Sequence, residues 1–155
     1  MNNAAYKKLD YSLSLISTAE GGKRFGCIIN SLHQVTSSRP PKFTLSLNND
    51  SATCGALKKS GVAAVTLLAK EAEDKVVNEF GYKSGRAVDK FAAFPFETDS
   101  QGCPYLKEGM VSRLSLKVTE TVAIGSYTLF ICELLDAEVL GSGDCLTVKE
   151  FEKRG

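Results

Sequence analysis

The sequence predicts a mainly β fold, a small barrel with a few helices in its connections. Three segments alternate apolar and polar side chains with a period of two, the pattern of half-buried strands: residues 11–15, 43–48 and 114–119. Residues 62–68 and 127–135 are apolar throughout, and the second run is rich in the β-branched and aromatic residues that favour strands. Strands at short spacing with few helices between them are typical of a barrel.

Turn and helix signals separate these strands. Gly21-Gly22 predicts a hairpin between the first strand and residues 25–30, and Gly125-Ser126 divides the last two strands. Pro40-Pro41 starts an extended segment, and residues 141–144 mark another turn. Three helical segments are expected: residues 53–59 ending at Gly61, residues 69–80 ending at Gly81, and one turn over 88–92.

The composition describes one globular domain over residues 1–155. With 43% hydrophobic and 24% charged residues, a chain of this length buries enough surface to fold without a disulfide or a metal. A formal net charge of +1 gives no electrostatic reason to expect nucleic acid or an anionic membrane as partner. Neither a signal peptide nor a membrane-spanning segment is recognisable, so we expect a cytoplasmic protein.

The residues that could carry chemistry without a cofactor are sparse. The five cysteines are far apart, no CxxC pair occurs, and His33 is the single histidine, which argues against a zinc centre and against a disulfide framework. We expect reduced thiols that are mainly buried apolar residues. No hydrolase constellation, Walker loop or GxGxxG fingerprint occurs, and no catalytic acid or base is identified. Redox chemistry would therefore need a bound cofactor.

One polar segment, residues 30–41, offers side chains suited to both edges of a flavin ring. Leu32 and Val35 are apolar cover for the dimethylbenzene edge. Donors and acceptors for the polar edge come from Asn30, Ser31, Gln34 and Thr36. The alternative interpretation is an ordinary polar loop that joins two strands.

Two further polar segments are suited to a phosphate. Residues 46–53 lead from a strand into a helix N-terminus, whose N–H groups attract anions, although an ordinary helix cap is the alternative and Asp50 would oppose a phosphate if it pointed inward. Residues 80–91 place Lys83, Arg86 and Lys90 beside a glycine turn. There the alternative is a solvated helix start with Asp89 as a surface partner.

In their order and spacing these motifs resemble the flavin reductase-like FMN-binding split-barrel family. The resemblance is closest to the flavoredoxin-like group and to the flavin reductase domain of high-molecular-weight rubredoxins. The matching residues extend over nearly the whole chain: Asn30-Ser31, 34–37, Pro40-Pro41, 46–48, Thr53, Phe80-Gly81, 84–86, 88–91, Gly125, 128–131 and 136–139.

The resemblance implies a six-stranded antiparallel split β-barrel and a homodimer with FMN at its interface. The cofactor-binding residues that it implies are Asn30, Ser31, Val35 and Thr36 at the isoalloxazine ring, Ser46, Leu47, Asn48 and Thr53 at the ribityl-phosphate arm, and Ser84, Gly85, Arg86, Lys90 and Phe91 completing the site.

The implied activity is hydride transfer from NADH or NADPH to flavin, followed by electron transfer to a separate small molecule or small redox protein. Many relatives have a histidine at the position of Tyr127, and some have a Tyr-His pair where this chain has residues 148–151. We expect these differences to affect nicotinamide binding more than flavin binding. The alternatives are a non-catalytic FMN-binding electron-transfer protein, and a barrel that binds another ligand, such as haem, or none.

Overall fold

The computed structural model describes residues 1–82 and 89–155. The strands are β1 (Ser14–Glu20), β2 (Lys23–Ile29), β3 (His33–Thr36), β4 (Lys42–Asn48), β5 (Val62–Leu68), β6 (Glu97–Thr98), β7 (Pro104–Tyr105), β8 (Met110–Ile124) and β9 (Tyr127–Val139). The helices are α1 (Ala52–Ser60), α2 (Asp74–Tyr82) and α3 (Val148–Glu152), with 3-10 turns η1 (Tyr6–Lys8) and η2 (Lys90–Ala93). Within the described ranges, no helix is long and apolar enough to cross a membrane.

The mainly β prediction is confirmed, but the main sheet has seven strands rather than six. Its order is β2-β1-β5-β8-β9-β4-β3, and the neighbouring strands pair antiparallel. The additional strand is β3, in the segment 30–41 that we interpreted as suited to a flavin ring, with a polar loop as the alternative. It lies at the sheet edge with His33, Gln34 and Val35 exposed, so it shows none of the alternation that identifies a half-buried strand.

Both expected hairpins form, while α2 differs from its prediction. Gly21 and Gly22 adopt positive φ between β1 and β2, which glycine tolerates and which matches the twist of a two-residue hairpin. Gly125 does so between β8 and β9. Helix α2 begins at Asp74 and continues through Gly81 to Tyr82, so Gly81 is not the helix stop that its residue type suggested.

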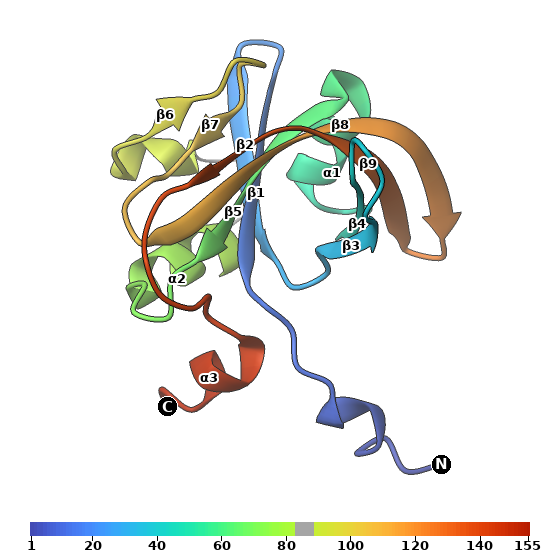
Figure 1. Ribbon diagram of the computed structural model, residues 1–155, viewed down its shortest axis with the longest axis vertical. Helices are drawn as coiled ribbons and strands as arrows, with labels where there is room; N and C mark the ends of the chain where they lie inside the picture. The colour runs from blue at the N-terminus through green and yellow to red at the C-terminus, as the bar shows by residue number, and fades with distance from the viewer. Residues whose placement is uncertain (83–88) are drawn as a thin grey trace.

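The first apolar core lies between the sheet and α2. Leu15 from β1 packs with Val77 and Phe80 from α2 and with Phe91 from η2. The phenyl rings of Phe80 and Phe91 are 4.9 Å apart between centroids. In Figure 1, α2 lies on the side of β1 and β5 opposite to α1. This core therefore fixes the end of α2 and the η2 turn against the sheet.

The second apolar core shows that the sheet curls. Ile16 from β1, Leu45 from β4, Leu116 from β8 and Phe130 from β9 form one buried cluster with Leu57 from α1. Strands β1 and β4, which lie near opposite ends of the sheet order, therefore both pack against α1. As a result, the C-terminal ends of β2 and β4, which are not neighbours in the sheet, lie close together.

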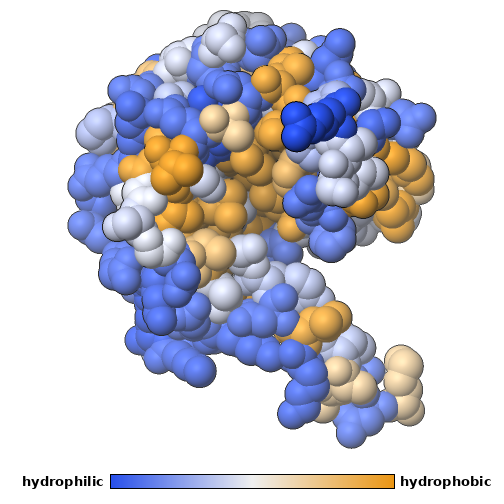
Figure 2. Space-filling model, viewed as in Figure 1, coloured by the Kyte–Doolittle hydropathy of each residue, from blue (hydrophilic) through white to orange (hydrophobic). Residues whose placement is uncertain are grey.

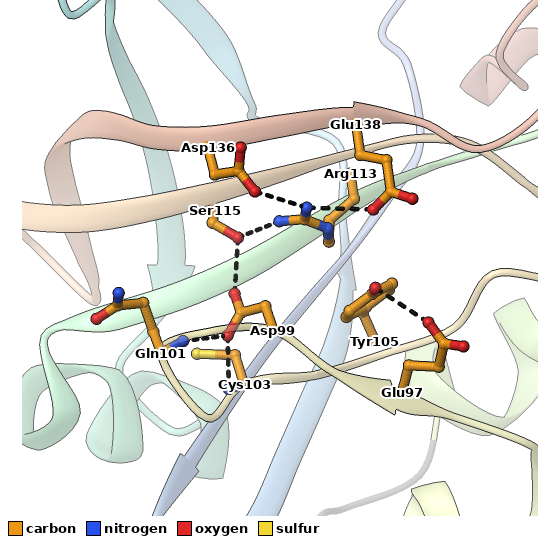
Figure 3. A network of polar contacts seen from close by, with 9 residues as sticks. All are labelled: Glu97, Asp99, Gln101, Cys103, Tyr105, Arg113, Ser115, Asp136 and Glu138. Carbon is orange, nitrogen blue, oxygen red and sulfur yellow. Dashed lines mark hydrogen bonds and ion pairs between the residues drawn. The ribbon is translucent and has the colours of Figure 1, made fainter.

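A polar cluster holds the β6–β7 hairpin against the sheet. Arg113 on β8, only 5% exposed, donates to Asp136 at 3.0 Å and to Glu138 at 3.2 Å, both on β9. It also donates to Ser115, whose hydroxyl donates in turn to Asp99 at 2.7 Å (Figure 3). Asp99 precedes β7, so the cluster connects this hairpin to β8 and β9.

Candidate functional site

A cavity of about 560 Å³ opens where β2 and β4 end and α1 begins. This volume falls within the usual range for small-molecule and cofactor sites, roughly 300–1,000 Å³. The cavity is lined by Leu13, Cys27, Ile28, Ile29, Asn30, Ser31, Ser46, Leu47, Asn48, Asp50, Ser51, Ala52, Thr53, Phe80, Gly81, Tyr82, Lys90 and Tyr127. Both polar and apolar side chains are present, as a flavin would require.

Side-chain hydrogen bonds hold the segments around the cavity together. The Ser31 hydroxyl accepts from the Ser46 N–H and donates to the Ser46 carbonyl, each at 3.0 Å, and so joins the chain after β2 to β4. The Asn49 side chain accepts from the Thr128 hydroxyl at 2.6 Å, which ties the loop before α1 to β9. These contacts fix the geometry of the rim without using a ligand.

The start of α1 lines the cavity. Ser51 is the N-cap of α1, in an extended conformation, and makes no side-chain capping bond. The first N–H groups of a helix lack intrahelical partners, and together with the helix dipole they attract an anion. Asn48 uses its side-chain oxygen to accept from the Asp50 N–H at 2.9 Å, which shapes the loop that leads into the helix.

Lys90 brings a buried positive charge to the same cavity. Its side chain is 5% exposed, and Nζ donates to the carbonyls of Gly26 at 3.2 Å and Phe80 at 3.4 Å. Burial lowers the pKa of Lys90, while Cys27 and Glu79 act in the opposite direction. In residues 1–82 and 89–155, no carboxylate lies within ion-pair distance of Nζ. Backbone carbonyls do not neutralise an ammonium, so Lys90 can still pair with an anion.

Cys27 lines the same cavity as Lys90 and the start of α1. Burial raises the pKa of the Cys27 thiol, whereas hydrogen bonds with Thr53 and Ser51 and the charge of Lys90 act in the opposite direction. Ser51 and Thr53, at the start of α1, line this cavity too. Lys90 and the start of α1 therefore border one cavity, which Asp50 also lines.

The structure brings half of the expected cofactor residues together. Seven line the cavity: Asn30, Ser31, Ser46, Leu47, Asn48, Thr53 and Lys90. Three more, Ser84, Gly85 and Arg86, lie outside the described residues.

Four expected residues lie elsewhere. Leu32 packs against the second core, and Phe91 is fully buried in the first core. Val35 is 53% exposed on the edge strand β3. The Thr36 hydroxyl bonds to Ser38 and accepts from the Lys42 N–H at 3.0 Å, so it is engaged within its own hairpin.

Several residues of the cavity wall were not anticipated there, Cys27 and Tyr82 among them. Cys27 was expected to be an apolar core residue, and nothing in its neighbourhood along the chain distinguishes it from Cys54, Cys103 or Cys132, which are buried. Tyr82 follows the Phe80-Gly81 motif but was not assigned a role. The signal that could have found Tyr82 is its place at the end of a helix that leads into the polar segment 80–91.

Known proteins of similar sequence identify the family. Residues 6–148 match the model of the flavin reductase like domain. A ferric-chelate reductase (NAD(P)H) of Archaeoglobus fulgidus is 30% identical over 151 residues, which cover 97% of this chain and 89% of that protein. A high molecular weight rubredoxin of Moorella thermoacetica is 31% identical over 157 residues, covering 100% of this chain and 68% of that protein.

A solved structure of similar fold agrees with this result. Flavoredoxin from Methanosarcina acetivorans superimposes with a TM-score of 0.78 at 20% identity, over 90% of this chain and 73% of the other. The resemblance noted in the motifs is thereby confirmed. The chain belongs to the flavin reductase-like family of oxidoreductases.

Proposed function

We propose that this protein is an FMN-dependent NAD(P)H:flavin oxidoreductase that passes electrons to a separate acceptor. The observation that carries the proposal is the convergence of a buried, carbonyl-bonded Lys90 and the N-terminus of α1 in one cavity. A phosphate monoester fits this arrangement, because it accepts from an ammonium and from helix N–H groups at once. The residues present therefore fit the phosphate end of FMN.

The remaining wall residues are suited to the rest of the cofactor. Asn30, Ser46 and Asn48 present polar atoms at the rim, while Leu13 and Ile29 offer apolar surface. When bound, the flavin supplies the hydride chemistry, and the protein binds and orients it and limits its contact with water. The contribution that we propose for this chain is therefore positioning of the flavin.

NADH or NADPH is the proposed hydride donor. The name of the Archaeoglobus relative, ferric-chelate reductase (NAD(P)H), supports this choice. Tyr127 is 46% exposed on the cavity wall, where its ring can border a nicotinamide without donating a proton as an imidazolium would. The proposed acceptor is a small molecule or a small redox protein, and the name of the rubredoxin relative is consistent with the second.

A homodimer with FMN at the interface is the proposed assembly. Val122, Ile124 and Tyr127 are exposed at the tip of the β8–β9 hairpin, and Tyr127 also lines the cavity. Figure 2 shows further apolar surface along the hollow between the body and the N-terminal arm. Sedimentation of the purified protein should give a dimer, and Ile124→Asp should shift it toward monomer. A monomeric wild type would contradict this assembly.

Two measurements test the proposed activity. Titration with FMN, FAD and riboflavin, followed by flavin fluorescence, should show that FMN binds at least about tenfold tighter than riboflavin, because the phosphate meets Lys90 and α1. Anaerobic addition of NADH or NADPH should then bleach the bound flavin within seconds. Failure to bind FMN would overturn the proposal. Binding without bleaching would instead favour the non-catalytic electron carrier.

A further inference from the structure

Lys90 reaches the cavity from η2, a turn of four residues. A turn this short has little stability of its own, so other contacts must fix where its side chains lie. Three contacts connect η2 to β2, and each involves a different side chain. They involve Asp89, Phe91 and Lys90 itself, three consecutive residues.

Asp89 makes two separate contacts with its two carboxylate oxygens. Oδ1 accepts from the Phe91 N–H at 3.1 Å and so caps η2. Oδ2 accepts from Arg24 on β2, through Nε at 3.1 Å and through Nη2. The Arg24 guanidinium also lies 4.4 Å from the centroid of the Phe96 ring. Asp89 therefore joins the turn to the strand by an ion pair and a cap.

Phe91 and Lys90 complete the attachment at a single glycine. A Cβ on Gly26 would lie 3.0 Å from Cε2 of Phe91 and 3.2 Å from Cδ1 of Phe80, so the ring packs where only glycine leaves room. The Gly26 carbonyl accepts from Lys90 Nζ at 3.2 Å. The adjacent residues of the turn therefore lie in different surroundings: the Phe91 ring packs in the first core, and Lys90 lines the cavity.

We propose that Asp89 and Arg24 are positioning residues for Lys90, and that their ion pair holds η2 on β2 so that the ammonium faces the anion-binding end of the cavity. The ligand in question is the phosphate of the flavin, and to that extent the inference rests on the proposed function. The Arg24 and Asp89 side chains are 36% and 38% exposed. An exposed ion pair adds little to global stability, so its contribution is local placement.

The substitution Asp89→Asn isolates the charge, because asparagine keeps an oxygen that can cap η2 but loses the ion pair. FMN affinity, measured by fluorescence titration, should fall about tenfold in Asp89→Asn and similarly in Arg24→Gln. In a Lys90→Met background, Asp89→Asn should cause no further loss, since its effect acts through Lys90. Glu73→Gln, which removes the exposed Glu73–Lys75 pair, is the matched control and should leave affinity unchanged.

A second readout needs no flavin. Acetylation of the apoprotein by an N-hydroxysuccinimide ester, followed by peptide mass spectrometry, measures how accessible Lys90 is. Lys90 should react several-fold faster in Asp89→Asn and Arg24→Gln than in the wild type or Glu73→Gln. Unchanged Lys90 reactivity, or additive losses of FMN affinity in the double variant, would overturn the positioning role. If the wild type binds no FMN while Lys90 reactivity still rises, the proposed function fails and the positioning role stands.

Discussion

Two cations of this molecule, Arg113 and Lys90, are buried to the same degree and have opposite surroundings. Each is 5% exposed. Arg113 has two carboxylate partners, Asp136 and Glu138, and its hydrogen bonds with them outweigh burial and raise its pKa. Lys90 has two backbone carbonyls, and burial lowers its pKa.

The difference separates a structural charge from one available to a ligand. A buried cation with carboxylate partners is neutralised within the fold, and its loss leaves those carboxylates uncompensated. A buried cation that has only dipolar partners is poorly compensated. Folded proteins retain such a cation at sites where an anion binds. The first kind occurs at the β6–β7 hairpin, which borders no part of the cavity, and the second at the cavity itself.

The largest effect that this comparison predicts is a loss of stability in Arg113→Met. The substitution should lower the free energy of unfolding by about 2–3 kcal/mol. This is less than the roughly 3–5 kcal/mol for breaking a fully buried ion pair, because both carboxylates are partly hydrated. Their side chains are 61% and 41% exposed for Asp136 and Glu138. Thermal unfolding should show Tm lower by roughly 5–10 °C for a domain of this size.

The control for this prediction is FMN affinity, which should stay within about twofold of the wild type in Arg113→Met at a temperature where the variant is folded. A Tm within about 2 °C of the wild type would contradict the structural role of the cluster, since that shift corresponds to less than about 1 kcal/mol.

The opposite pattern is expected for Lys90→Met. FMN affinity should fall about 10–100-fold, because a hydrogen bond to a charged group contributes roughly 1.5–3 kcal/mol. Stability of the apoprotein should change by less than about 1 kcal/mol, since removing a poorly compensated charge offsets the loss of two carbonyl hydrogen bonds. Fluorescence titration and thermal unfolding measure the two quantities on the same samples.

Riboflavin is the matched ligand for Lys90→Met, since it lacks only the phosphate. Its affinity should change less than about threefold, within the scatter of a neutral contact. Equal losses for FMN and riboflavin would mean that Lys90 contacts the ring or the ribityl chain instead of the phosphate. That result would contradict the assignment of Lys90 as the cation available to an anion.

The strands could be predicted from the sequence far better than the cavity could. Alternation was sufficient for β4, which buries one face, and turn glycines were sufficient for the two hairpins, whose turns need positive φ. The first strand was expected at residues 11–15 but extends over Ser14–Glu20, where the first five residues are all buried and show no alternation. Strand β3 was missed because its first three residues are exposed, which leaves hydrophobicity without a period. What identifies β3 is pairing with β4, a long-range property that no short window of sequence contains.

The cavity could not be assembled from local patterns, because it depends on how the sheet curls. Asn30, Asn48 and Thr53 were expected at the site, yet only the packing of β1 and β4 around α1 brings β2 close to β4. Lys90 and Phe91 are adjacent in one motif, and the structure sends one to the cavity wall and the other into the first core. Family resemblance selects such a motif but does not separate the residue that lines the cavity from the residue that packs in the core.

The smallest expected effect is a pH signature of the Arg113 cluster. The hydrogen bond from Arg113, with one from the Ala137 N–H, lowers the pKa of Asp136 despite the opposing effect of burial. A carboxyl whose pKa is lower in the folded state stabilises the protein above its unfolded pKa of about 3.9, and this contribution disappears as pH falls through the folded value. Asp136→Asn should therefore be less stable than the wild type at pH 7 and equally stable near pH 2–3 in urea unfolding. For Lys90 the pKa is also lowered, so its effect on stability has the same slope with pH. There, however, it is a penalty on the charged form at neutral pH, and the penalty is relieved as pH rises. A difference for Asp136→Asn that persisted unchanged at low pH would show that its carboxylate is not paired with Arg113, and Arg113 would then resemble Lys90 more than the structure indicates.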